Sequence, residues 1–316
     1  MNDGSFRIAV VGAGRMGRVH IAALERSDNV DVAAVVEPVE SARAEIAAGG
    51  VPTFATVGEL LSDREIDGAL IAAPTDRHVE LVETLAGAGV PILCEKPVGT
   101  RAADATAAAA TVAHAGIPFQ VGYWRRFVPA LGALRERIVA GDLGEILQIS
   151  CLQWDAEPPS AQFRAHSGGI VVDMAVHEFD QARWLTGQDV ASVVAMSGGG
   201  GEPAADPDVA AIAARLTGGT LLTVSVGRIF PEGDCCWVEV FGSAGYERIP
   251  FIWGPPTALG DDVFHAALIA QAEAFADAVR GGGDAARIAA GAADAVAALS
   301  AAELAAAALR NGGGPV

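Results

Sequence analysis

Cysteine is scarce in this chain, and the few that occur fit neither a metal site nor a disulfide framework. Cys94, Cys151, Cys235 and Cys236 include no CxxC pair and no partner histidine at zinc-site spacing. A chain of 316 residues can build a core without disulfides. We therefore expect four small buried side chains and no metal.

Basic residues are also in the minority. Lysine and arginine number 21 against 39 acidic residues, which gives a net charge of -18. A surface of this sign repels polyanions. Nucleic acid and anionic membranes are therefore not expected as partners.

Long apolar runs are absent as well. No stretch has about 20 apolar residues without charges or helix breakers, so we expect no membrane span. The start, MNDGSFRIAVVGAG, lacks the basic and apolar regions of a signal peptide. These observations predict a cytoplasmic protein, and the length predicts two domains.

A glycine-rich turn stands near the start of the chain. The β-branched run RIAVV at 7–11 leads into GAGRMG, Gly12 to Gly17, and helical periodicity follows. This strand, turn and helix context is the one that a dinucleotide fingerprint requires. Gly12 and Gly14 allow a tight turn and close backbone approach, and Gly17 allows close helix packing, so a pyrophosphate is expected at the helix start.

An acid ends the second expected strand. VDVAAVVEP reaches Glu37 about twenty residues after the glycine turn, the spacing at which a carboxylate accepts ribose hydroxyls and repels a 2′-phosphate. The pattern favours NAD over NADP. The alternative is a solvated acid at a strand end.

Strands and helices continue to alternate as far as IPFQVGYW, which predicts a doubly wound parallel sheet. Ligands of such sheets lie beyond the carboxyl ends of the strands. The residues at those ends are Gly12, Glu37, Pro74 with Thr75, and Glu95 with Lys96.

Lys96 stands between an apolar strand and Pro97. Its backbone is expected to be extended and its side chain to enter the crevice, where an ammonium group can donate to a reacting oxygen. The alternative is a surface pair with Glu95.

Three of the ionisable residues in the stretch GGIVVDMAVHEFDQARWL, Gly168 to Leu185, recur at helical spacing. Asp173, His177 and Asp180 lie four and three residues apart, which places them on one helix face. They form either a core histidine held by its acids or a reactive group. Histidine suits proton transfer because its pKa is near neutral.

The later part of the chain predicts a second α/β domain with a large open, mainly antiparallel sheet. Runs such as TLLTVSV and WVEVFG alternate apolar and polar residues, which is typical of half-buried strands. Residues 198–208 are expected to form a flexible loop, and 264–310 alanine-rich helices of the scaffold. We assign 1–122 to a Rossmann domain and 123–316 to a substrate-binding and oligomerisation domain.

The motifs together resemble a known family. GAGRMG, AAPTDRH, CEKPVG, GYWRRF and the Asp-x-x-x-His helix occur in the order found in the glucose–fructose oxidoreductase, inositol dehydrogenase and MocA (Gfo/Idh/MocA) family. The chain is most similar to its inositol 2-dehydrogenase branch. One departure is Trp154-Asp155-Ala156, where that branch usually reads Arg-Asp-Pro.

The resemblance implies a set of site residues. The catalytic residues are Lys96, Asp173 and His177, and the substrate contacts are these three with Arg126 and Asp155; Arg125-Arg126 is alternatively a surface charge pair. The expected cofactor-binding residues are Gly12, Gly14, Arg15, Met16, Gly17, Glu37, Ala73, Pro74, Thr75, His78, Glu95 and Lys96. Asp180 is interpreted as structural.

These features predict an NAD-dependent dehydrogenase that oxidises a secondary hydroxyl of a cyclitol or sugar. His177 is the expected general base, and Lys96 is expected to polarise the reacting oxygen. The alternatives are a keto-sugar or anhydro-sugar reductase or dehydrogenase of the same family, and a non-catalytic NAD-binding sensor. The resemblance also suggests a homo-oligomer, a dimer or tetramer.

Overall fold

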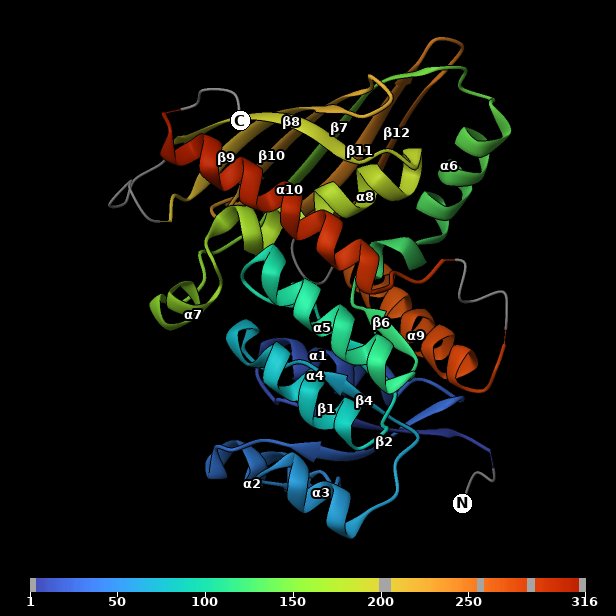
Figure 1. The fold of residues 1–316 in the computed structure, drawn as a ribbon, viewed down its shortest axis with the longest axis vertical. Coiled ribbons are helices and arrows are strands. Elements are labelled where there is room, and N and C mark those ends of the chain that lie inside the picture. The colour runs from blue at the N-terminus through green and yellow to red at the C-terminus, as the bar shows by residue number, and fades with distance from the viewer. Residues whose placement is uncertain (1–3, 199–205, 255–258, 283–287, 313–316) are drawn as a thin grey trace. The chain divides into compact units, whose positions relative to one another are not determined.

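The chain divides into two compact units in a computed structural model that describes residues 4–198, 206–254, 259–282 and 288–312. The first unit comprises Met1–Gly99, Ala103–Trp124 and His265–Ala293. The second comprises Thr100–Ala102, Arg125–Phe264 and Asp294–Val316. Figure 1 draws the first unit around the blue and cyan elements and the second around the yellow and orange strands.

The first unit is built on a six-stranded sheet in the order β3-β2-β1-β4-β5-β6. All its neighbouring strands are parallel. The strands are β1 (Phe6–Val11), β2 (Val30–Val36), β3 (Thr53–Phe54), β4 (Gly68–Ile71), β5 (Ile92–Cys94) and β6 (Phe119–Val121). The strand order reverses direction between β1 and β4, so this is the doubly wound sheet that the alternation predicted.

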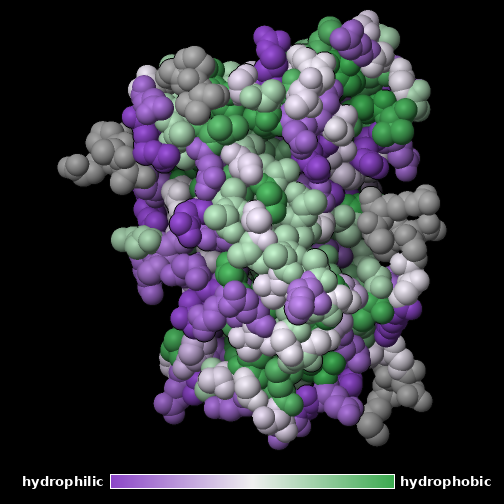
Figure 2. All heavy atoms as spheres, viewed as in Figure 1, coloured by the Kyte–Doolittle hydropathy of each residue, from purple (hydrophilic) through white to green (hydrophobic). Residues whose placement is uncertain are grey.

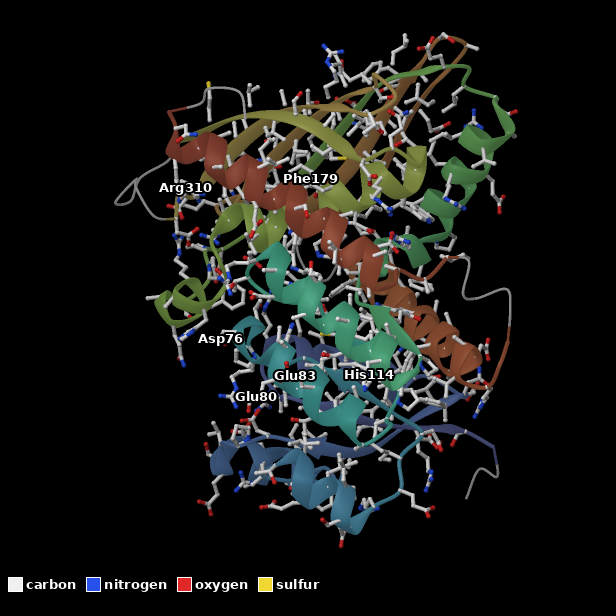
Figure 3. The ribbon with its side chains drawn as sticks, viewed as in Figure 1. Asp76, Glu80, Glu83, His114, Phe179 and Arg310 are labelled. Atoms are coloured by element: carbon white, nitrogen blue, oxygen red, sulfur yellow. The ribbon has the colours of Figure 1, made fainter. Side chains whose placement is uncertain are left out.

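Helices connect these strands. They are α1 (Arg15–Leu24), α2 (Glu40–Ala48), α3 (Val57–Asp63), α4 (His78–Gly87) and α5 (Ala102–Ala115), with a short 3₁₀ turn η1 (Thr75–Arg77) before α4. Helix α4 is amphipathic: His78, Val82 and Leu85 are buried, whereas Glu80 and Glu83, labelled in Figure 3, are exposed. Its burial pattern follows the helical period, as expected for a helix on a sheet face.

One helix from the end of the chain also packs on the first sheet. In α9 (Leu259–Val279), Ala272, Phe275 and Ala276 belong to the same core cluster as Phe6. The rings of Phe275 and Phe6 meet edge to face with centroids 5.7 Å apart, a favourable aromatic geometry. Assigning all of 123–316 to the second domain therefore differs from the observed units, because this apolar helix is part of the Rossmann core.

The second unit contains a mixed, mostly antiparallel sheet in the order β12-β11-β7-β10-β9-β8. Its strands are β7 (Ile146–Trp154), β8 (Val190–Gly198), β9 (Val209–Leu216), β10 (Leu221–Gly227), β11 (Asp234–Gly242) and β12 (Tyr246–Gly254). Among the described strands of this second sheet, only β7 and β10 are paired in parallel. The expected second sheet is confirmed, with one parallel pair that the alternation pattern did not reveal.

Helices cover one face of this second sheet, as Figure 1 shows for α8 and α10. The helices of the unit are η2 (Trp124–Phe127), α6 (Pro129–Ala140), α7 (Ala161–His166), η3 (Val171–Ala175), α8 (Val176–Thr186) and α10 (Ala292–Arg310). Strand residues alternate between buried and exposed, most regularly along β9. The sheet thus has a buried, helix-covered face and an open face.

Strand β7 and helix α6 were missed in the sequence, although α6 has clear boundaries. Pro129 is its first residue, and Gly141 follows it with a φ of 83°. Proline is suited to the first helical turn and glycine to a left-handed helix end. Part of the loop expected at 198–208, namely 199–205, lies outside the described residues.

Helix α10 is long and apolar enough, by length and composition, to cross a membrane. The same helix has seven buried residues along its length, from Ala295 to Ala308, and it carries Asp294 and Glu303. Buried residues at helical spacing are typical of a core helix. Its many alanines give the pale green band over α10 in Figure 2, so we interpret α10 as scaffold.

Candidate active site

The glycine turn leaves its backbone open toward the start of α1. Gly12 has a φ of 102°, and a Cβ there would lie 2.7 Å from the backbone nitrogen of Ala73. A Cβ on Gly17 would lie 2.0 Å from the carbonyl oxygen of Gly12. At Gly14, the N-cap of α1, no atom lies within 4 Å of an added Cβ, and no side chain caps the helix. These residues fit a dinucleotide, because the space and the N–H groups of the helix start remain available to a pyrophosphate.

Glu37 is held beside this turn. It is buried, and its Oε2 accepts the N–H of Ala13 at 2.8 Å while its Oε1 accepts that of Val39 at 2.9 Å. The alternative of a solvated strand-end acid is therefore wrong. The carboxylate is oriented by two backbone donors, and each oxygen has a second lone pair with which to accept a ribose hydroxyl.

His78 ties together the loops that follow β4 and β5. Its Nε2 lies 2.8 Å from the carbonyl oxygen of Ala73, and its Nδ1 lies 2.8 Å from that of Pro97. Burial lowers the pKa of His78 below 6.5, against the opposing effect of these carbonyls. The buried ring thus fixes the segment beside Lys96 from within the fold.

Glu95 is engaged with a residue that the sequence did not single out. Its Oε1 lies 2.6 Å from Nε2 of His20 on α1, and its Oε2 accepts the backbone N–H of Lys96 at 3.1 Å. Burial alone would raise the pKa of Glu95, but the hydrogen bond and charge of His20 and the charge of Lys96 lower it below 4.5. Glu95 therefore supports the backbone at Lys96.

The predicted cofactor residues of the first unit all follow the carboxyl ends of its strands. Gly12, Gly14, Arg15, Met16 and Gly17 follow β1; Glu37 follows β2; Ala73, Pro74, Thr75 and His78 follow β4; and Glu95 and Lys96 follow β5. Because β1 and β4 are neighbours, these loops meet where the strand order reverses, the usual site of a dinucleotide.

In the second unit, the Asp/His stretch begins with an irregular helical turn. Residues Val171–Ala175 form a π-helical turn, and Val176–Thr186 continue as an α-helix. The expected helix is therefore regular from Val176 onward, whereas Asp173 lies in the π turn that precedes it. Single π turns occur frequently at functional sites.

Two acids of this stretch form buried ion pairs. Glu178 lies 2.7 Å from Nη1 of Arg125, and Asp180 binds Nη2 of Arg126 at 2.5 Å and its Nε at 3.0 Å. Burial lowers the pKa of Arg125, but the charge of Glu178 raises it above its ordinary value. The alternative of a surface arginine pair is wrong, since both arginines are buried.

Arg126 also reaches Asp294 of α10, at 3.1 Å. Its guanidinium is thus shared by two carboxylates within the second unit. This geometry favours a structural role over the expected substrate contact, and it supports the structural interpretation of Asp180.

Asp155 is linked to Arg125 through the side chain of Gln153. Gln153 accepts from Nη2 of Arg125 at 2.7 Å and donates to Oδ1 of Asp155 at 3.2 Å. Trp154 instead donates its indole N–H to Ser225 at 3.0 Å and covers Gly227. Neighbouring strand residues face opposite ways, so this indole belongs to the open face of the sheet and not to the helix-covered face.

Asp173 and His177 are the two residues of this stretch that are predicted to react. The side chain of Asp173 is 15% exposed, against 0% for Glu178 and 3% for Asp180. His177 is buried, with 5% of its surface exposed. Lys96 belongs to the first unit and these residues to the second, so their joint action stays a prediction.

The four cysteines are free and buried, as expected. Among the described residues, no group of three or more histidine, cysteine, aspartate or glutamate side chains is placed to hold a metal ion.

The doubly wound sheet, its open glycine turn and its oriented strand-end acid define a dinucleotide-binding enzyme fold. Comparison with protein families agrees. Residues 6–123 match the oxidoreductase family with an NAD-binding Rossmann fold, and 132–247 match the GFO/IDH/MocA C-terminal domain. The chain belongs to the Gfo/Idh/MocA family of NAD-dependent oxidoreductases, which confirms the expected family, enzyme class and cofactor.

Individual relatives cover nearly the whole chain. The rhizopine catabolism protein MocA of Rhizobium meliloti is 46% identical over 95% of this chain and 94% of its own. The myo-inositol dehydrogenase Hyg17 of Streptomyces leeuwenhoekii is 36% identical over 87% and 89%. A crystal structure of a putative myo-inositol dehydrogenase from Sinorhizobium meliloti 1021 is 28% identical, covers 99% of both chains and has a TM-score of 0.89.

Proposed function

We propose that this protein oxidises a secondary hydroxyl of a cyclic polyol or sugar to a ketone, with NAD as the hydride acceptor. The observation that carries the proposal is the difference in burial between the acids of the Asp/His stretch. Glu178 and Asp180 are almost fully buried against Arg125 and Arg126, whereas Asp173 keeps a larger exposed fraction and His177 follows it by four residues. Membership of an oxidoreductase family gives this pair its chemical setting.

His177 is the general base in this proposal. It takes the hydroxyl proton as hydride leaves the carbon, for which an imidazole is suited by its near-neutral titration. Asp173 orients the ring and accepts from a second substrate hydroxyl. Asp155, on the same face of the second sheet as Gln153 by its hydrogen bond, is a further substrate contact.

Lys96 donates a hydrogen bond to the reacting oxygen and stabilises its developing negative charge. The Glu95 and His78 contacts hold the backbone on both sides of this lysine. NAD, when bound, supplies the hydride acceptor, and the glycine turn and Glu37 hold its pyrophosphate and ribose.

The substrate class follows from the relatives. Two of them are named as myo-inositol dehydrogenases and one for rhizopine catabolism. An inositol-type cyclitol is therefore the first candidate, and a rhizopine, a pyranose and an anhydro-sugar follow. The same residues serve the reverse reaction, reduction of a keto-sugar, because the reaction retraces one path.

The test is a panel of candidate substrates, with turnover measured through the absorbance of the nicotinamide. The purified protein receives NAD and, in turn, myo-inositol, scyllo-inositol, a rhizopine, pyranoses and anhydro-sugars; the reverse assay uses NADH and the matching ketones. Turnover of at least one member is expected. Tight NAD binding with no turnover of any member would instead support the second candidate, a sensor that binds NAD on the same fold.

We also infer a homo-oligomer in the cytoplasm, formed through the open face of the second sheet. Val194, Met196, Leu221 and Phe241 expose apolar surface there, and an exposed apolar patch of this kind is typical of interfaces. Light scattering of the wild type and of Met196→Glu tests this, since a charge at a buried interface should yield monomers. A monomeric wild type would refute it.

A further inference from the structure

Arg228 is the largest fully buried side chain of the described chain. It follows β10 directly, and its own accessible surface is 0%. In the strand, Val226 is buried and Gly227 lies under the indole of Trp154. Arg228 therefore points to the helix-covered side of the second sheet, where η3 carries Asp173. A guanidinium is always charged, so it needs carboxylate partners there.

Two aspartates flank this guanidinium. Nη1 of Arg228 binds Oδ2 of Asp206 at 2.5 Å, and Nη2 lies 3.6 Å from Oδ2 of Asp173. The second contact is an ion pair longer than a hydrogen bond. The Nε and Nη2 groups have no hydrogen-bond partner among the described residues, and Asp173 provides the carboxylate that lies near Nη2.

Asp206 anchors the arrangement to the start of η3. Its Oδ1 accepts the backbone N–H of Ile170 at 2.8 Å, one residue before the π turn. The backbone N–H of Arg228 in turn donates to the carbonyl of Asp208 at 3.0 Å. The arginine and the turn that carries Asp173 are therefore held by one short loop segment.

A second arginine binds this loop from outside. Arg164 of α7 pairs with Asp208 and lies 3.7 Å from Asp206, and its side chain is 25% exposed. Its ion pairs are with these two aspartates of the loop, whereas Arg228 also pairs with Asp173. Arg164 therefore serves as an internal comparison for Arg228.

We propose that Arg228 is a positioning residue for the dehydrogenase reaction: its buried guanidinium holds the carboxylate of Asp173 in the orientation that substrate requires. This role rests on the proposed function of Asp173. With no accessible surface, Arg228 cannot touch substrate or cofactor, so it acts only through the aspartate. Small displacements of a reacting group cost about 10- to 100-fold in rate.

The test is a double-mutant cycle between positions 228 and 173. Arg228→Gln should lower kcat about 10-fold or more and leave the Kd for NAD within about twofold, because NAD binds through the first unit. In the Asp173→Asn background the same change should have little further effect. Arg228→Lys, which keeps the charge but loses the fork, should recover part of kcat.

Arg164→Gln is the matched control, with kcat expected within about twofold of the wild type since this change leaves the Asp173 contact in place. An equal loss in Arg164→Gln and Arg228→Gln, or equal losses from Arg228→Gln in both backgrounds, overturns the positioning role. If Arg228→Gln does not fold, the cycle is run with Arg228→Lys, and the same equality overturns it.

Failure of the proposed function would look different. The wild type would then turn over no member of the substrate panel. Urea unfolding of the same four proteins still measures whether positions 228 and 173 are coupled, and additive effects on the unfolding constant would overturn the contact itself.

Discussion

Oε2 of Glu37 and the backbone nitrogen of Ala13 lie 2.8 Å apart, which joins the acid after β2 to the glycine turn after β1. The carboxylate thereby has two tasks. It fixes the turn that faces the pyrophosphate, and it presents its oxygens where the ribose is expected. Cofactor preference and the shape of the turn are consequently linked through one side chain.

Replacing Glu37 with serine should weaken NAD binding and raise the relative use of NADP. The shorter hydroxyl loses both the charge that repels a 2′-phosphate and the bond to Ala13. We expect KM for NAD to rise about 10-fold or more, the scale of a lost charged hydrogen bond. Steady-state kinetics with both cofactors measure this. Glu40→Ser, an exposed acid in the first turn of α2, is the control, and an unchanged NADP/NAD ratio in Glu37→Ser would refute the assignment.

Gly14 and Gly17 should respond differently to alanine. A methyl group at Gly14 meets no atom within 4 Å, whereas at Gly17 it would lie 2.0 Å from the oxygen of Gly12. Gly14→Ala is therefore expected to keep the melting temperature and lose NAD affinity. Gly17→Ala should lower the melting temperature as well, because backbone must shift. Thermal unfolding and NAD titration of both variants test this; equal stability of the two would contradict the packing.

The sequence predicted the Rossmann half well because its signals are local. Each strand, the glycine turn and Glu37 follow from short patterns, and parallel order follows from the helices between strands. The observed order of the first sheet is the expected doubly wound one. The assignment of α9 to the second domain failed, because its place in the first unit depends on a contact between Phe275 and Phe6. No local pattern encodes partners so distant in sequence.

The same limit explains the errors around the Asp/His stretch. The acids were visible in the sequence, but their partners Arg125, Arg126 and Arg228 come from other elements. His20, the partner of Glu95, stands on α1 as an ordinary buried helix residue. A π turn at Asp173 depends on tertiary packing and has no propensity signal of its own.

Glu178→Gln should destabilise the protein strongly. The substitution leaves the buried guanidinium of Arg125 without its carboxylate at 2.7 Å, and breaking a buried pair from one side costs about 3–5 kcal/mol. Urea unfolding measures the change. Glu80→Gln removes a pair with Arg77 in which both side chains are exposed and should cost less than about 1 kcal/mol. Similar losses in the two variants would show that the Glu178 pair is not buried in solution.

Lys96→Ala should lower kcat about 100- to 1000-fold, the scale for losing a donor to a developing oxyanion, with the Kd for NAD almost unchanged. His177→Ala should have a comparable effect, since a general base contributes about 100-fold or more. Steady-state kinetics measure kcat, and NAD titration measures the Kd for NAD. Lys96→Arg, which keeps the charge, is the comparison. Full turnover in Lys96→Ala would refute the proposed role.

His78 should make stability depend on pH near neutrality. Burial lowers its pKa in the folded protein below the ordinary 6.5, so the unfolded chain binds the proton first as pH falls. The stabilising contribution is therefore complete above about 6.5 and is lost as pH falls from there toward the lower folded pKa. Glu95, whose folded pKa is lowered from 4.5, contributes only in a more acidic range.

The free energy of unfolding should consequently fall between about pH 7.5 and pH 5.5 in the wild type, and the fall should be smaller in His78→Gln, which has no titrating ring. Equal slopes in the two proteins would mean that the ring is hydrated and titrates as an exposed histidine does.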